Sequence, residues 1–305
     1  MTAAIKIQGL TKDYGGGRGL FDLDLEVMEG EAFGYLGPNG AGKSTTIRLL
    51  MGFIQATRGS ASILGLDSQR ESVAVKRLVG FMPGELPQFG GLRGRDIAGH
   101  FGALRGGVDQ ARVKEITERL DLDLALKFRQ YSTGNKRKLA ILLAFMHRPK
   151  LLILDEPSSG LDPLNQQEFY ALAREARDAG ATIFLSSHIL SEVEHACDRV
   201  GIIRSGRLVK VAELDEIHNI RLHRLELEFA PGTDVPEAAI RSADGVEDVI
   251  VEDNKVTCTV KGPFDPLLKV LQGATVTNLV SHEPSLEELF LTYYRPEAPS
   301  EALAR

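Results

Sequence analysis

Short apolar runs with the length of buried strands recur along the first two thirds of the chain. Runs at residues 5–10, 20–27 and 31–36 lie around a glycine-rich cluster, which predicts strands joined by a loop. Two later runs, at 151–154 and 182–185, lead directly into polar residues. Continuous apolar strands with polar groups after their carboxyl ends indicate a parallel sheet, so we expect an α/β fold.

The middle of the chain changes to the spacing of a helix. Val113, Ile116 and Leu120 lie three or four positions apart, and apolar residues at 139–146 repeat in the same way. This pattern predicts an inserted helical region within residues 92–148.

Two short runs, at 200–203 and 207–211, are separated by Ser205 and Gly206. Serine and glycine suit a tight reversal, so this segment predicts a hairpin. We expect the hairpin to close a first domain at residues 1–215.

The pattern changes again after about residue 219. Strand-like and helix-like runs then follow the order β-α-β-β-α-β, which is the split arrangement of ferredoxin-like domains. The expected strands are 221–229, 246–251, 255–260 and 274–281, and the expected helices are 236–241 and 266–271. A last helix at 285–294 has Ser285 as N-cap and Glu288 three residues later, which is a capping box. We therefore predict a second domain at 220–295 and a frayed tail at 296–305.

A complete phosphate loop, with the pattern G-x-x-x-x-G-K-S, lies between the strand 31–36 and a helical run at 46–51. Its residues are Gly37, Pro38, Asn39, Gly40, Ala41, Gly42, Lys43, Ser44 and Thr45. Glycines let backbone N–H groups approach phosphate oxygens, and the helix N-terminus adds partial positive charge. Lys43 then reaches the β and γ phosphates, and Ser44 ligates Mg²⁺. The alternative is a glycine-rich turn that only caps a helix, but the strand-then-helix context favours a nucleoside triphosphate site.

Polar residues follow both of the later apolar runs. Asp155 and Glu156 end the first of them, where a triphosphate site needs a magnesium anchor and a water activator. We assign Asp155 to Mg²⁺ and Glu156 to the attacking water. His188 follows the second run at the same predicted sheet edge, where it can contact the γ-phosphate. Considered alone, the two acids could begin a turn and the histidine could be structural.

Residues 131–135 read Tyr-Ser-Thr-Gly-Asn and precede a helical run at 136–147. Ser132 offers a hydroxyl and Gly134 leaves backbone N–H groups unhindered at a helix N-terminus. This combination predicts a second anion site. Without further context the same residues are only an N-cap, and that interpretation is favoured.

Composition narrows the range of partners. The chain has 305 residues, a formal net charge of −6 and a pI near 5.7, so it lacks the basic character of nucleic-acid-binding domains. We interpret the basic cluster at 136–138 as solvated helix surface. No apolar run has the length of a membrane span, and the N-terminus does not resemble a signal peptide. The two cysteines, Cys197 and Cys258, suit a reducing compartment, so we expect a cytoplasmic protein.

Taken together, these motifs resemble the nucleotide-binding subunit of an ABC transporter, over residues 1 to about 215. The phosphate loop is similar to a Walker A motif and residues 151–156 to a Walker B motif with its catalytic glutamate. Residues 158–162, Ser-Ser-Gly-Leu-Asp, resemble the D-loop, and His188 resembles the switch histidine. Tyr14 occupies the place of the aromatic residue that stacks on adenine.

The resemblance implies a fold and a set of roles. The fold is a P-loop ABC ATPase domain with a mixed sheet, an N-terminal antiparallel β region and a helical subdomain at about 89–150, followed by a small α+β ferredoxin-like domain. The cofactors are ATP and Mg²⁺. Lys43, Glu156 and His188 are the implied catalytic residues, and Ser132 with Gly134 would contact ATP held by the opposite subunit.

Two departures from the family pattern stand out. The signature motif, Leu-Ser-Gly-Gly-Gln in the family, has Thr133 in place of a glycine and Asn135 in place of the glutamine. The Q-loop glutamine would fall at Gly84, which has no side chain to contact magnesium or water. We expect that Glu85 or Gln88 compensates.

Residues 283–290 resemble the ending of single-cassette subunits that serve bacterial exporters of the ABC-2, drug-resistance type. The implied protein is an Mg-dependent ATPase that dimerises around two ATP molecules, as a homodimer or with a related chain. It would drive a separately encoded membrane permease from the inner face of the cell membrane. A soluble ABC ATPase without a permease, acting in translation or DNA repair, is the alternative, and the second domain could in addition serve as a regulatory switch.

Overall fold

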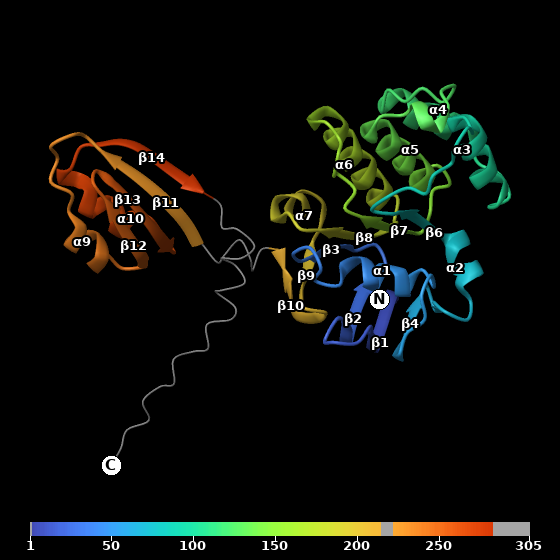
Figure 1. Ribbon diagram of the computed structural model, residues 1–305, viewed down its shortest axis with the longest axis horizontal. Coiled ribbons are helices and arrows are strands. Elements are labelled where there is room, and N and C mark those ends of the chain that lie inside the picture. The colour runs from blue at the N-terminus through green and yellow to red at the C-terminus, as the bar shows by residue number, and fades with distance from the viewer. Residues whose placement is uncertain (1, 215–221, 283–305) are drawn as a thin grey trace, which may run out of the picture. The chain divides into compact units, whose positions relative to one another are not determined.

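The computed structural model of the chain describes residues 2–214 and 222–282 (Figure 1). The chain divides into two compact units, Met1–Leu214 and Asp215–Arg305. Within the described residues, no helix combines the length and the apolar character needed to cross a membrane.

The first unit begins with an antiparallel sheet. Its strands are β1 (Ala3–Asp13), β2 (Gly19–Met28), β4 (Arg58–Ile63) and β5 (Leu66–Asp67), in the order β2-β1-β4-β5. Along β2 the buried residues alternate with exposed ones, as expected for a sheet with one covered face. The predicted strands at 5–10 and 20–27 are confirmed. β4 was not predicted, because its residues Arg-Gly-Ser-Ala-Ser-Ile include no apolar run.

A six-stranded sheet forms the centre of the first unit, in the order β10-β9-β3-β8-β7-β6. Its strands are β3 (Ala32–Leu36), β6 (Val79–Met82), β7 (Leu151–Asp155), β8 (Thr182–Ser187), β9 (Arg199–Arg204) and β10 (Arg207–Glu213). The five strands from β9 to β6 are parallel, and every residue of β3, β7 and β8 is buried. The predicted parallel sheet is therefore confirmed.

The expected hairpin joins β9 to β10. Ser205 and Gly206 both have positive φ angles, 48° and 74°, which are the values of a two-residue type I′ turn. A side chain at position 206 would collide with the carbonyl oxygen of Gly19, so this turn requires a glycine.

Helices lie on both sides of the central sheet (Figure 1). The helices of the first unit are α1 (Lys43–Leu50), α2 (Ser72–Leu78), α3 (Gly94–Ala103), α4 (Gln110–Arg119), α5 (Thr133–Phe145), α6 (Pro163–Asp178) and α7 (Leu190–Ala196), with a 3-10 turn η1 at Phe128–Gln130. α3, α4, η1 and α5 form the predicted helical region. The side chains of Asp109, Ser132 and Asp162 cap the N-termini of α4, α5 and α6.

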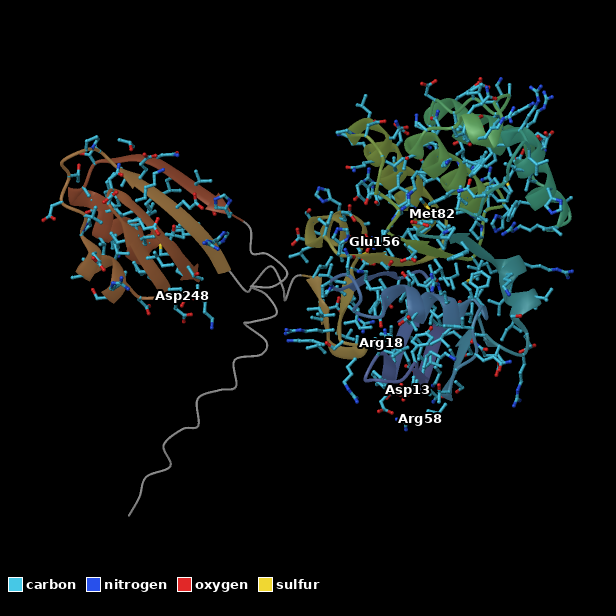
Figure 2. All side chains as sticks on the ribbon, in the orientation of Figure 1. Asp13, Arg18, Arg58, Met82, Glu156 and Asp248 are labelled. Carbon is cyan, nitrogen blue, oxygen red and sulfur yellow. The ribbon has the colours of Figure 1, made fainter. Side chains whose placement is uncertain are left out.

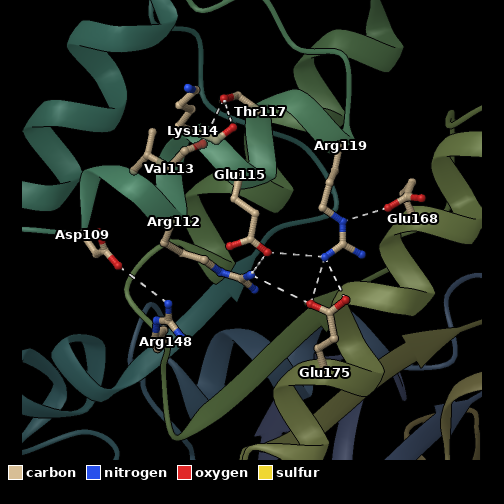
Figure 3. Close-up of polar contacts among 10 residues, drawn as sticks. All are labelled: Asp109, Arg112, Val113, Lys114, Glu115, Thr117, Arg119, Arg148, Glu168 and Glu175. Atoms are coloured by element: carbon tan, nitrogen blue, oxygen red, sulfur yellow. Dashed lines mark hydrogen bonds and ion pairs between the residues drawn. The ribbon is translucent and has the colours of Figure 1, made fainter.

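An ion network joins the helical region to α6 (Figure 3). Arg119 on α4 lies 2.8 Å from Glu175 and 2.9 Å from Glu168, both on α6. Arg112 on α4 contacts Glu115 at 2.7 Å. The hydrogen bond to Glu175 raises the pKa of Arg119, so this guanidinium stays charged. The network fixes α4 against α6 through charges that remain partly solvated.

The described part of the second unit is a small antiparallel α+β domain. Its elements are β11 (Leu222–Phe229), α9 (Glu237–Ser242), β12 (Val246–Glu252), β13 (Lys255–Lys261), α10 (Asp265–Val270), the 3-10 turn η2 (Leu271–Gly273) and β14 (Val276–His282). The strand order is β12-β13-β11-β14. Alternate residues of β11 and β13 form its core with α9 and α10. The predicted order β-α-β-β-α-β is confirmed, while the predicted helix 285–294 and the tail 296–305 lie outside the described residues.

Candidate active site

The phosphate loop follows β3 directly and leads into α1. The helix begins at Lys43, three residues earlier than the apolar pattern predicted, because Gly42 is its N-cap with a φ angle of 114°. Gly37 has no room for a side chain, since a Cβ atom would collide with the carbonyl oxygen of Ile203. Local sterics and backbone conformation therefore favour glycine at positions 37 and 42. The first N–H groups of α1 lie at the end of the loop.

One cavity of about 770 Å³ brings most of the expected site residues together. Glu156, which is labelled in Figure 2, is part of its lining. The other expected residues in the lining are Tyr14, Pro38, Asn39, Gly40, Ala41, Gly42, Lys43, Ser44, Thr45, Asp155 and His188. Gly37, Ser132 and Gly134 do not line this cavity.

Lys43 is almost fully buried at the base of the loop, with 6% of its side chain exposed. Its ammonium group donates to the carbonyl oxygens of Gly37 at 2.6 Å and Pro38 at 3.3 Å. It also lies 3.2 Å from Glu156 Oε1. A buried cation requires such partners, and a triphosphate can replace the carboxylate among them.

Asp155 is the last residue of β7 and is 6% exposed. Ser186 on the neighbouring β8 donates to Asp155 Oδ1 at 2.6 Å, which orients the carboxylate. Ser44 on α1 lines the same cavity. In the described residues no group of three or more His, Cys, Asp or Glu side chains could hold a metal by itself. A hydroxyl and one carboxylate are nevertheless the sparse oxygen ligands with which proteins bind Mg²⁺ beside phosphates and water.

Glu156 has an unusual backbone, with a φ angle of 51°. Its N–H group donates to the carbonyl oxygen of Ser186, so the adjacent strand fixes this conformation. Its carboxylate lies between two cationic or polar partners: Lys43, and His188 whose Nδ1 atom is 2.6 Å from Glu156 Oε2. Positive φ at a residue other than glycine costs free energy and occurs preferentially at functional sites. The arrangement aims a carboxylate at the space beside the phosphate loop.

Glu192 on α7 connects the segment after Glu156 with the strand that precedes His188. Ser158 donates a short hydrogen bond to Glu192, and Ser187 donates to the other carboxylate oxygen at 2.5 Å. Ser187 in turn accepts from the N–H group of Ile189. These contacts were not predicted, because no local sequence pattern marks a glutamate as a bridge between two loops.

Tyr14 lies in the loop between β1 and β2 and is 51% exposed. The ammonium group of Lys12 lies 5.5 Å from the centre of its ring. Arg18 from the same loop also lines the cavity, which the sequence did not suggest. An exposed aromatic ring at the cavity is free to stack on a planar ligand.

Ser132 and Gly134 lie at the N-terminus of α5, where Ser132 accepts a hydrogen bond from the N–H group of Asn135 at 3.2 Å. Ser132 therefore acts as an N-cap. Ser132 is exposed, and a Cβ atom on Gly134 would lie 3.4 Å from the carbonyl oxygen of Gly160.

The interpretation of residues 136–138 as solvated surface is wrong. Lys138 is 8% exposed and lies 3.4 Å from the carbonyl oxygen of Asp121. Arg137 is half-buried, donates to the carbonyl oxygen of Pro83 at 3.0 Å and lines the cavity. Both side chains point inward because α5 packs between β6 of the central sheet and the helices α3 and α4. Arg137 and Lys138 lie four and five residues after Thr133, the first residue of α5. This helical spacing was the sequence signal that could have identified them.

The segment after β6 also lines the cavity, with Gly84 and Glu85. A Cβ atom on Gly84 would lie 3.3 Å from Asp155 Oδ2, so position 84 faces the carboxylate without offering a side chain. Of the two residues expected to compensate, Glu85 lines the cavity and Gln88 does not.

A second cavity, of about 560 Å³, is apolar. It lies between β6, α2 and the helical region, and its lining includes Phe53, Phe81, Phe89, Phe101, Leu104 and Leu143. Phe53 and Leu104 are 51% and 60% exposed. Lys76, Arg77 and Arg105 also line it. An exposed apolar hollow with a basic border is typical of a surface that binds another protein.

Comparison with known proteins gives consistent results. Residues 20–159 match the family model described as "ABC transporter". The bacitracin transport ATP-binding protein BcrA of Bacillus licheniformis is 38% identical over 233 residues, 75% of each chain. The linearmycin resistance ATP-binding protein LnrL of Bacillus subtilis is 31% identical over 302 residues, which cover 94% of this chain and 97% of that one. A solved ATP-binding subunit of an ABC transporter superimposes with a TM-score of 0.65 at 30% identity, over 71% of this chain and 92% of that chain.

Proposed function

Because this chain belongs to the ABC transporter family of ATP-binding proteins, we propose that it is the ATP-hydrolysing subunit of a bacterial exporter whose membrane permease is a separate chain. One observation carries the proposal: the phosphate loop, Asp155, Glu156 and His188 line a single cavity. The names of two relatives, which refer to bacitracin transport and linearmycin resistance, support export rather than import.

ATP is bound through the phosphate loop. Backbone N–H groups of the loop and of the first turn of α1 donate to the phosphate oxygens, and the buried Lys43 supplies positive charge. Tyr14 stacks on the base. Lys43 lies 3.2 Å from Glu156 Oε1, and a triphosphate can take the place of that carboxylate as the partner of the ammonium group, which leaves Glu156 free.

Hydrolysis transfers the γ-phosphoryl group to water. Glu156 orients the water and takes up its proton while the water oxygen attacks the γ-phosphorus and the bond to the bridging β,γ oxygen breaks, giving ADP and inorganic phosphate. His188, 2.6 Å from Glu156, holds that carboxylate and contacts the γ-phosphate. Ser44 and Asp155 would hold Mg²⁺, which neutralises phosphate charge when it is bound.

A second nucleotide-binding subunit completes the site. Ser132 and Gly134 do not line this chain's own cavity, and Ser132 is exposed at the start of α5. This supports their assignment to ATP held by a partner cassette, either a second copy of the chain or a related one. The helix N-terminus then directs its free N–H groups at the γ-phosphate across the dimer interface.

The permease binds in the apolar cavity. Phe53 and Leu104 expose large apolar surfaces there, and Arg77 and Arg105 border them. An amphipathic helix from a membrane protein, with an apolar face and an acidic edge, matches this surface. We assign the permease to the ABC-2 type and the subunit to the inner face of the cell membrane. The two domains then divide as 1–215 for nucleotide binding and 220–295 for an accessory role.

Light scattering of the Glu156→Gln variant tests this function. Slow hydrolysis should trap the dimer. The measured mass of the protein should therefore double with Mg-ATP and remain that of a monomer with Mg-ADP. The matched control combines Glu156→Gln with Lys43→Ala, which should remain monomeric with either nucleotide. If the variant binds ATP but stays monomeric, the chain requires a different subunit to complete its site. Full ATP turnover by Glu156→Gln would contradict the assigned role of Glu156.

A further inference from the structure

We propose that Arg137 binds the terminal phosphate of the ATP held by its own chain, and so replaces the side chain that position 84 lacks. The proposal rests on the proposed function, because it requires ATP in the cavity beside the phosphate loop. It adds a phosphate ligand from α5 to those of the loop.

Arg137 lies beside two segments that border the cavity. Its guanidinium donates to the carbonyl oxygen of Pro83, which directly precedes Gly84, at 3.0 Å. The Cγ atom of its stem would lie 4.0 Å from a Cβ atom on Gly160, in the segment after Glu156. Its side chain also forms part of the cavity lining. The guanidinium is therefore held at the cavity by packing and by a backbone hydrogen bond.

Charge favours a phosphate as the ligand of Arg137. Burial lowers the pKa of the guanidinium, and the nearby carboxylates of Asp155, Glu156 and Glu85 act against that shift, so it remains cationic. A guanidinium has five N–H donors, and the hydrogen bond to Pro83 occupies one of them. A partly desolvated cation with free donors, in a cavity that receives a triphosphate, is placed to bind phosphate oxygens in the bidentate manner of arginine.

The position of Arg137 indicates the terminal phosphate rather than the inner ones. The loop amides serve the phosphates nearest to α1, whereas Asp155 and Glu156 stand where the γ-phosphoryl group reacts. Arg137 interacts electrostatically with those two acids. Gly84 has no side chain to place in the space beside Asp155. A Cβ atom at position 84 would lie 3.3 Å from Asp155 Oδ2, so this position faces the carboxylate.

A phosphate contact at Arg137 links both ends of α5. The helix begins at the residues assigned to the partner's ATP, and Ala140 and Leu143, three and six positions after Arg137, line the apolar cavity. Release of the terminal phosphate would remove a ligand that holds α5 toward the central sheet. The helix would then be free to shift at the dimer interface and at the permease surface together.

The discriminating experiment compares nucleotides that differ in the terminal phosphate. Isothermal titration of the full chain with AMP-PNP and with ADP, both with Mg²⁺, is carried out at a concentration where light scattering finds monomers. For Arg137→Gln we expect the Kd of AMP-PNP to rise about 10-fold, the size of a lost hydrogen bond to a charged group, and the Kd of ADP to stay within about 2-fold. Arg137→Lys, which keeps the charge, should recover part of the loss.

The control is Arg95→Gln, because Arg95 lies on α3, is 63% exposed and does not line the cavity. It should leave both Kd values unchanged. Unchanged affinity of Arg137→Gln for AMP-PNP, or an equal loss for AMP-PNP and ADP, would overturn the proposal and leave Arg137 a packing residue. Failure of the wild-type chain to bind either nucleotide would instead refute the proposed function.

Discussion

The two cavities of the first unit lie close together and have opposite chemistry. The larger one is lined by the phosphate loop, three carboxylates and three basic side chains, and the other mainly by aromatic and aliphatic residues. Both are lined by the segment after β6 and by α5. After β6, Gly84 and Glu85 line the polar cavity while Leu86 and Phe89 line the apolar one. A change in the nucleotide would therefore act on backbone that also lines the proposed permease surface.

The largest expected effect is on ATP hydrolysis, which we assign to the polar cavity alone. Glu156→Gln should lower ATP turnover about 100-fold or more, because the general base is lost. Binding of the permease should be unchanged, since Glu156 does not line the apolar cavity. Turnover is measured by phosphate release, and permease binding by co-purification with the tagged chain. Loss of both properties together would show that the two cavities do not act separately.

The converse change is directed at the apolar cavity. Phe53→Asp combined with Leu104→Asp should reduce permease binding about 10-fold or more, because charge replaces exposed apolar contact surface. The Kd for ATP should stay within about 2-fold, and both side chains are exposed enough for the chain to fold. The pair Val280→Asp and Ile250→Asp, exposed in the second unit, is the matched control. Equal loss of permease binding in that control would place the docking surface elsewhere.

A pH-dependent effect should arise beside the apolar cavity. Burial, with the charge of Arg105, lowers the pKa of His147 from 6.5 to about 4. The folded state therefore favours the neutral ring, and stability present above pH 6.5 is lost as the pH falls toward 4. We expect His147→Gln to reduce that loss by about 1–2 kcal/mol at pH 5. Urea unfolding at pH 7 and pH 5 measures it.

The exposed His100, changed to Gln, is the control for that measurement. It should leave the pH dependence of stability unaltered. An identical pH dependence in His147→Gln and in the wild-type chain would show that other groups cause the acid sensitivity.

The smallest expected effect concerns the connection between the helical region and α6. Arg119→Gln removes ion pairs with Glu168 and Glu175, and should cost about 1 kcal/mol or less, because the partners are partly solvated. The loss should shrink at high salt. Urea unfolding at low and high ionic strength tests it, with Arg95→Gln as the control. A salt-independent loss would point to packing of the side-chain stem instead.

The sequence predicted the polar cavity far better than the apolar one. The strands β3, β7 and β8 are buried throughout, so their apolar runs could be recognised without tertiary context, and the loop and acids follow them directly. The apolar cavity was not predicted, because Phe53, Phe81 and Leu104 come from separate segments that only the folded chain brings together.

The errors in the site have a similar origin. Arg137 and Lys138 belong to a basic cluster that resembles a solvated helix face, and only packing on both sides of α5 buries them. The helix α1 starts at Lys43 because the loop's last glycine caps it, which the apolar period could not indicate. Roles that depend on a second subunit, such as those of Ser132 and Gly134, remain predictions.

The backbone of Glu156 sets a limit on how this protein can be made more stable. Its positive φ angle is a conformation that glycine or asparagine adopts more readily than glutamate does. Selection for heat resistance alone would therefore favour replacements at position 156, and would enrich chains that outlast the wild type and no longer consume ATP. A selection of variants for heat resistance should therefore also require ATP turnover. Without that requirement it would favour variants that lack Glu156, the residue on which the proposed ATPase depends.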